Sequence, residues 1–204
     1  SVEAVHQKWV EKCCAFVSAK HMNFFTFQKM CRQMIEEFDA IPITDRKKPR
    51  VGIVGEILVK YAPAANNHLV ELLESEGAEA VVPDLLDFML YCFYNQIYKA
   101  DQLGMSKKTA FISRLGIDGL EYLRSGARKA FEKSVHFEPP CRIYQTVEYA
   151  KEIVSIGNQT GEGWFLTGEM IELIHSGVNN IVCTQPFGCL PNHVVGKGVI
   201  KELR

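Results

Sequence analysis

The sequence predicts an α/β protein with a small parallel sheet, helices on both faces of that sheet, and a large helical insertion. Two short β-rich runs, "VGIV" at residues 51–54 and "AEAVVP" at 78–83, flank an amphipathic helical stretch, which is typical of a β–α–β unit. A third apolar run, "NIVC" at 180–183, precedes the last predicted helix. We therefore expect about three parallel strands joined by right-handed crossovers.

The segments before and between these strands are predicted to be helical. Residues 2–38 repeat apolar side chains every three or four positions, as an amphipathic helix does. Two prolines and the charged run "DRKKPR" then break the pattern, so residues 1–48 are predicted to be an N-terminal helical segment with a solvated linker. Residues 49–204 would form the lobe that contains the sheet, with residues 84–135 as its helical insertion.

Three further helices are predicted in the C-terminal part of the chain. One follows the double proline at 139–140, one ends near Gly177, and the last starts near Pro191 and continues through "VVGKGVIKELR". Because this last helical pattern reaches the end of the chain without a stop signal, we expect the chain to be part of a longer protein.

The composition argues against several classes of protein. The 23 basic and 24 acidic side chains give a net charge of −1, and the basic residues are scattered, so nucleic acid is not an expected partner. No apolar run approaches the roughly 18 residues of a membrane span, and we expect no signal peptide. The seven cysteines are irregularly spaced and form no CxxC motif, which favours a reducing compartment, the cytoplasm.

The carboxyl ends of the predicted strands are the place where a ligand is expected to bind, as in other open parallel sheets. These ends are Gly55–Glu56, Pro83–Asp84 and Thr184–Cys189. Glu56 and Asp84 would act there as acid–base groups or, alternatively, as helix caps. The sequence contains neither a GxGxxG nor a GxxxxGK[ST] motif, so it offers no fingerprint for a dinucleotide or for a P-loop nucleotide.

Cys189 carries the most reactive side chain at this predicted edge. Pro191 suits the first position of a helix, which places Cys189 just before it, where exposed N–H groups and the helix dipole stabilise a thiolate. A thiolate binds iron or zinc, or attacks as a nucleophile. The alternative is a small buried side chain in a tight turn. His193 would either join Cys189 as a metal ligand or lie on the surface.

A glycine-rich stretch, "GEGWFLTGE" at residues 161–169, precedes the last predicted strand. It carries Glu162 and Glu169, and it would cradle a phosphate or form a lid, or else serve as a plain connector. Gly55 and Gly188 suit backbone angles that other residues avoid. These positions complete the set of candidate residues near the strand ends.

Three stretches of the chain together resemble a known family. They are "GIVGEILVKYAPAANNHLVELLESEGAEAVVPDLLDF", "GNQTGEGWFLTGEMIELIHSGVNNIV" and "QPFGCLPNHVVGKGVIKELR", and they cover most of residues 50–204. The family is that of the CoA-substrate-specific enzyme activase-related proteins. In these large proteins, a region similar to the subunits of 2-hydroxyacyl-CoA dehydratases (2-hydroxyglutaryl-CoA dehydratase among them) follows actin-like ATPase modules.

The resemblance implies a Rossmann-like lobe with an iron–sulfur function. Such dehydratase subunits hold a 4Fe–4S cluster on cysteines at strand ends. The cluster passes a low-potential electron, which an ATP-hydrolysing activator supplies, to a bound acyl-CoA during dehydration. Cys189 matches a cluster-ligand position and is the expected metal ligand. The residues expected to line the cofactor site are Gly55, Glu56, Asn66, Gly161, Glu162 and Gly188.

The chain also departs from the family pattern. It lacks the actin-like ATPase signature, so ATP hydrolysis would belong to an activase module elsewhere in the same chain or in a partner chain. Only Cys189 lies in a matching motif, whereas a cluster normally has about four ligands. The sequence therefore leaves open whether the chain is part of an enzyme. Two alternatives are a non-catalytic Rossmann-like binding or interaction domain without a cluster, and a redox-sensing thiol at Cys189.

Overall fold

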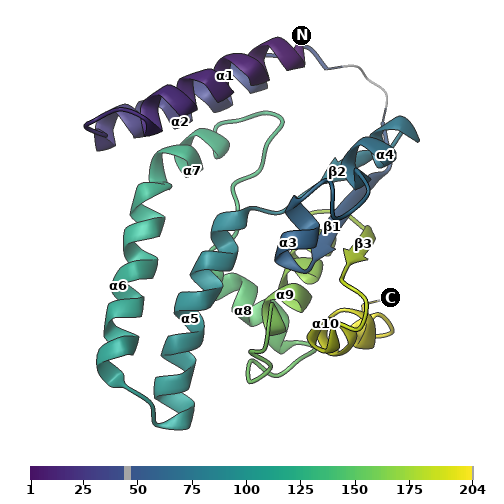
Figure 1. The fold of residues 1–204 in the computed structure, drawn as a ribbon. Helices are drawn as coiled ribbons and strands as arrows, with labels where there is room; N and C mark the ends of the chain where they lie inside the picture. Colours follow the sequence, from purple (N-terminus) through teal and green to yellow (C-terminus); the bar gives the residue numbers. More distant parts are fainter. Residues whose placement is uncertain (44–46, 204) are drawn as a thin grey trace. The chain divides into compact units, whose positions relative to one another are not determined.

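A three-stranded parallel sheet organises the part of the chain that carries the predicted site. This computed structural model describes residues 1–43 and 47–203. The strands are β1 (Arg50–Gly55), β2 (Glu79–Val81) and β3 (Asn180–Thr184), in the order β2-β1-β3 (Figure 1). All three predicted strands are present and parallel, so the prediction of an α/β protein with a small parallel sheet is confirmed.

The chain divides into two compact units. The helical unit consists of Ser1–Asp45 and Leu115–Pro140, and the sheet unit consists of Arg46–Arg114 and Cys141–Arg204. Residues 44–46 of the predicted linker lie outside the described residues. The division into 1–48 and 49–204 stays a prediction, because compactness within one chain does not show which segments fold alone.

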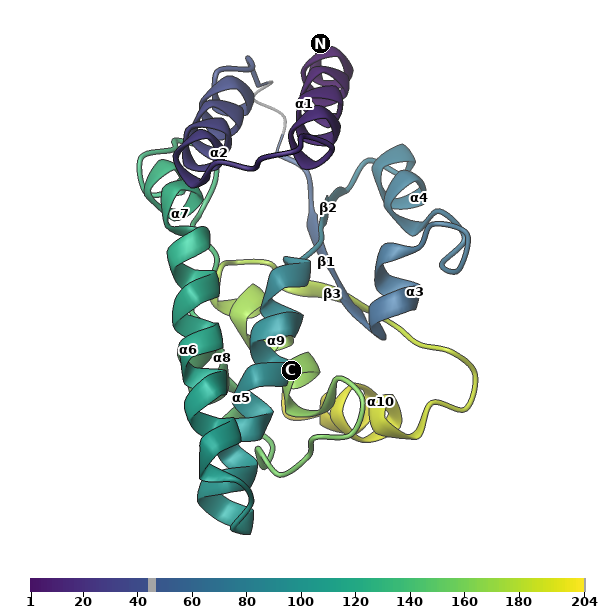
Figure 2. The same ribbon diagram turned by 60° about the vertical axis from the view of Figure 1, so that its left-hand side comes forward.

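Helices cover both faces of the sheet. Helices α3 (Ile57–Tyr61) and α4 (Leu69–Ser75) lie on one side of it, and α9 (Gly163–His175) lies on the other (Figure 2). The central strand β1 needs this double cover because its residues Ile53 and Val54, which point to opposite faces, are both fully buried.

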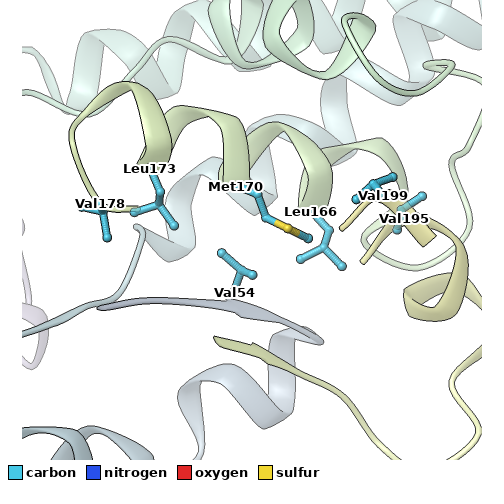
Figure 3. Packing of buried hydrophobic residues seen from close by; sticks show 7 residues of the cluster. All are labelled: Val54, Leu166, Met170, Leu173, Val178, Val195 and Val199. Carbon is cyan, nitrogen blue, oxygen red and sulfur yellow. The ribbon is translucent and has the colours of Figure 1, made fainter. Parts of the chain in front are cut away.

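The main apolar core of the sheet unit lies between β1 and α9. Val54 points from the strand toward the helix, which meets it with a row of apolar side chains spaced three and four residues apart (Figure 3). Each such side chain contributes about 1.5–3 kcal/mol when it is fully buried. The buried members of this core are Val54, Leu166, Met170, Leu173, Val178, Val195 and Val199.

Helix α9 is buried almost all round, and two more helices enclose it. They are α5 (Leu85–Leu103) and α8 (Ile143–Lys151). The indole of Trp164 on α9 donates a hydrogen bond of 2.9 Å to the Asn95 side chain on α5. Helix α8 packs closely against α9 at Gly168, which has no side chain. A Cβ at this position would lie only 2.9 Å from the carbonyl oxygen of Thr146 on α8.

Most of residues 84–135 are helical. After α5 they form α6 (Lys107–Leu123) and α7 (Ser125–Phe131). The chain passes from the sheet unit to the helical unit within α6. That these helices are one insertion into a Rossmann-like sheet stays a prediction.

The helical unit begins with two helices where one continuous helical region was predicted for residues 2–38. These are α1 (Val2–Val17) and α2 (Phe24–Asp39). Asn23 starts the second helix, because its side-chain oxygen accepts a hydrogen bond of 3.1 Å from the backbone N–H of Thr26. The indole of Trp9 donates to Glu37, at 3.0 Å, and ties α1 to α2.

The last helix is shorter than predicted. Helix α10 spans Leu190–Val195, and only a 3₁₀ turn at Lys197–Val199 follows it. The expectation of one helix through "VVGKGVIKELR" is therefore wrong within the described residues. Gly196 and Gly198 explain the difference, since glycine is among the poorest helix formers.

Candidate functional site

The ends of β1 and β3 meet at the edge where the site was predicted. Gly55 and Thr184 are partners in the sheet register, and the backbone N–H of Glu56 donates to the Thr184 carbonyl at 2.9 Å. Gly55 has φ +136°, and a Cβ on it would overlap the Thr184 carbonyl oxygen. Glycine is therefore required at this position by the close approach of the two strands.

Two carboxylates cap the helix that leaves β1. The Glu56 side chain accepts a hydrogen bond from the Val59 N–H at 2.8 Å, and Glu162 accepts one from the Ile57 N–H at 3.1 Å. Glu56 therefore acts as a helix cap, one of the two roles predicted for it. Because these N–H groups are engaged and two negative charges face them, the start of α3 is poorly suited to a phosphate.

Asp84 also serves as a cap, at the end of β2. Its carboxylate accepts a hydrogen bond of 2.8 Å from the backbone N–H of Leu86 at the start of α5. The capping alternative is thus the one that the geometry favours for both carboxylates that follow strands.

The glycine-rich stretch brings Gly161 next to the start of α10. The Tyr91 hydroxyl lies 2.8 Å from the Gly161 carbonyl, to which it donates a hydrogen bond, and burial raises the pKa of Tyr91 to about 12. Gly161 has φ +62°, and a Cβ on it would contact Pro191 at 3.4 Å. The loop therefore lies against the start of α10, where Cys189 precedes Leu190.

Cys189 itself lies at the rim of the sheet edge. It is the residue before α10, and its side chain is half-buried, so it is not the fully enclosed turn residue of the alternative interpretation. Its neighbours are strongly exposed: Phe187 by 108 % and Leu190 by 74 %. Gly188 has φ +74° with no atoms near its missing side chain, so it is needed for its backbone angle alone.

His193 faces the backbone of Cys189 rather than its thiol. Its Nδ1 lies 2.9 Å from the Cys189 carbonyl oxygen and 3.1 Å from the side-chain nitrogen of Gln185. Among residues 1–43 and 47–203, no group of three or more His, Cys, Asp or Glu side chains is arranged to hold a metal ion. His193 is exposed, as the surface alternative predicts, and its Nδ1 is engaged by the Cys189 carbonyl and the Gln185 side chain.

Cys183 on β3 is the cysteine nearest in sequence to Cys189. Burial raises its pKa to about 11, and the negative charges of Glu162 and Glu169 act in the same direction. It is therefore a neutral thiol at physiological pH and a poor ligand unless a metal displaces its proton. Its sulfur fits closely against α10, since a Cβ on Gly196 would lie 3.0 Å from it.

Asn66 connects two helices. Its side-chain nitrogen donates to the carbonyls of Val59, at 2.9 Å, and Lys60, at 3.3 Å, and its oxygen accepts from the Leu69 N–H at 3.1 Å. The amide is thus engaged in holding α3 and α4 together. Asn66 was predicted to line the cofactor site. The hydrogen bonds of its amide instead give it a structural role, which is to link α3 to α4.

A buried ion pair beneath the sheet edge was missed by the sequence interpretation. The Lys60 amine lies 2.7 Å from a carboxylate oxygen of Glu169, and the two side chains are 1 % and 4 % exposed. Burial raises the pKa of Glu169 to about 7, against the opposing effect of Lys60. Glu169, predicted in a phosphate loop or lid, thus lies inside α9. The only sequence signal for Lys60 is a lysine within the apolar run "ILVKY".

The buried amide of Asn192 is a second feature that the sequence did not predict. Asn192 lies on α10, is fully buried, and has no hydrogen-bond partner for either atom of its amide within the part of the chain that the structure describes. Burying an unpaired amide is costly, by about 1–3 kcal/mol. No pattern in the sequence indicates that an asparagine of a predicted helix is buried without a hydrogen-bond partner.

The chain as a whole matches no protein-family model, and neither a curated protein nor a solved structure is significantly similar to it. In the described ranges, none of the helices has both the length and the apolar character that crossing a membrane requires. The family resemblance and the functions that it implies therefore stay predictions.

Proposed function

We propose that this chain is a Rossmann-like lobe of an iron–sulfur protein of the 2-hydroxyacyl-CoA dehydratase and activase system, and that Cys189 supplies one ligand to a 4Fe–4S cluster. The observation that carries the proposal is the position of the thiol. It is half-buried at the carboxyl edge of a parallel sheet, just before a helix. This is the edge at which open α/β sheets bind their ligands.

The described residues do not fit a complete cluster, because such a cluster takes about four ligands and no multi-ligand group is present among them. The proposal therefore requires that another lobe provides the remaining cysteines. Phe187 and Leu190, which flank Cys189 and are largely exposed, provide an apolar surface that such a lobe would cover.

The finer features of the proposal come from the resemblance. The lobe would act in the cytoplasm with an actin-like ATPase module in the same chain or in a partner chain, and an acyl-CoA would be the substrate. Residues 84–135 would be its helical insertion. In this arrangement the chain's own groups would shape the edge: Gly55, Glu56 and Glu162 form its rigid wall, and Gly188 presents Cys189.

Anaerobic reconstitution with iron and sulfide tests the proposal. We expect little iron on this chain alone, and iron with acid-labile sulfide on the longer polypeptide that the resemblance implies. Cys189→Ser should abolish that iron, whereas Cys13→Ser, which changes an exposed cysteine on α1, should leave it unchanged. Equal iron content in the Cys189→Ser protein would remove Cys189 as a ligand.

The second candidate function is a Rossmann-like binding or interaction domain without a cluster. The lack of a multi-ligand metal group among the described residues favours it. It predicts that the longer polypeptide reconstitutes without iron and yet binds acyl-CoA, or a partner chain, in a manner that Cys189→Ser does not change. Iron analysis and binding measured on the same preparation separate the two functions.

A further inference from the structure

A pocket of about 290 Å³ lies within the helical unit, between α2 and α7. It belongs to a part of the chain that the proposed function does not use. Its walls combine polar and charged groups from one face of each helix. The polar and charged lining residues include Gln28, Arg32 and Glu36 on α2, and Ser125, Lys129 and Lys133 on or next to α7.

Side-chain hydrogen bonds join the two segments through lining residues near the start and at the end of α2. At one end, the Gln28 amide donates to the carbonyl of Leu123, and Gly126 makes room for it, since a Cβ there would overlap the Gln28 side chain. At the other end, the Asp39 carboxylate accepts hydrogen bonds from the Ser134 hydroxyl, at 2.7 Å, and from the His136 N–H, at 3.0 Å. The pocket is therefore built into the packing of the two helices.

Three cations line this pocket. Arg32 lies one helical turn after Gln28, and Lys129 and Lys133 are likewise one turn apart, so each pair shares a face. Within residues 1–43 and 47–203, none of the three makes an ion pair or a side-chain hydrogen bond. Two carboxylates also line the pocket. Asp39 accepts the hydrogen bonds at one end, so Glu36 is the one lining carboxylate outside those bonds, against three cations.

We infer that this pocket binds a small anion that carries a phosphate group. A guanidinium donates two parallel hydrogen bonds to phosphate oxygens, and two ammonium groups add charge from the facing helix. Ser125 adds a hydroxyl donor at the pocket wall. The volume is at the lower limit of ligand pockets, about 300 Å³, so a phosphate or a small phosphate ester fits better than a peptide. The inference does not depend on the proposed function.

Titration of the ¹⁵N-labelled chain tests this inference, with sodium phosphate in one arm and glycerol phosphate in the other. At low ionic strength we expect saturable shifts of the Ser125, Gly126 and Ser134 amides, with half-saturation at or below about 10 mM. Additional shifts of the apolar wall residues Ile35 and Ala130 with the ester alone would identify an organic phosphate as the preferred ligand.

Substitutions at the pocket complete the test. The double variant Arg32→Gln, Lys133→Ala should weaken binding at least tenfold, which corresponds to about 1.4 kcal/mol. Lys20→Ala, which removes an exposed lysine after α1 outside the pocket, is the matched control and should bind as the unchanged chain does. The inference fails if sodium chloride of equal ionic strength produces the same shifts, if no shift saturates, or if Lys20→Ala weakens binding as much.

Discussion

The two halves of the sheet edge differ in how completely their groups are engaged. On the β1 side, Gly55 is in contact with β3, Glu56 and Glu162 both cap α3, and Lys60 is paired inside the fold. On the β3 side, the connection to α10 projects Phe187 and Leu190 toward solvent. One half is closed by its own contacts, and the other is open.

This difference indicates which residues of the edge have a structural role and which remain exposed. Rigid scaffolds commonly position functional loops, and here the rigid half adjoins the loop that carries Cys189. A side chain whose polar atoms are already satisfied has little left to offer a ligand. Glu56 and Glu162 are therefore structural supports of α3, whereas Phe187 and Leu190 beside Cys189 keep most of their surface exposed.

The largest expected effect comes from breaking the ion pair on the closed side. Above pH 7, where Glu169 is ionised, Lys60→Met leaves its carboxylate buried without a partner, and we expect the free energy of unfolding to fall by about 3–5 kcal/mol. Urea denaturation followed by circular dichroism measures this change. The double variant Lys60→Met, Glu169→Met should recover most of the loss, because no charge is then buried alone. A loss below about 1 kcal/mol in the single variant would contradict the assignment of a closed half.

The next effect is a pH dependence that Glu169 gives to the closed half. In the folded chain Glu169 keeps its proton up to about pH 7, whereas its ordinary pKa is 4.5, so the folded state binds more protons between these values. The free energy of unfolding should therefore fall as pH rises from 4.5 to 7, by roughly 2–3 kcal/mol from this group. Glu169→Gln should flatten that slope in denaturation curves recorded across this range; an unchanged slope would assign it to other groups.

The smallest expected effects compare one glycine from each half. Gly55→Ala forces a Cβ onto the Thr184 carbonyl at a positive φ, and we expect a loss of about 2–3 kcal/mol in the free energy of unfolding. Gly188→Ala has the same kind of φ but open space around it, so about 1 kcal/mol is expected. Thermal unfolding of both variants ranks them, and equal losses would show that the two halves are equally constrained.

Much of the architecture is local in origin and could be read from the chain. The runs "VGIV", "AEAVVP" and "NIVC" are short and rich in β-branched residues, and each lies within a strand of the sheet or contains one. Proline and glycine marked several helix boundaries, and the capping alternative for Glu56 and Asp84 followed from their place after a strand. The predicted length of α10 was wrong because Gly196 and Gly198 were taken as part of the helix.

Other features exist only because distant segments meet. Lys60 and Glu169 are 109 positions apart, and the amphipathic patterns of their helices do not indicate that both charges face one buried point. The pocket of the helical unit likewise joins residues of α2 with residues about 95 positions later. The sequence by itself determined which segments are strands and where reactive side chains follow them, since those choices depend on neighbours along the chain. Only the tertiary structure decided which charges are paired, buried or left open, because pairing and desolvation depend on neighbours in space.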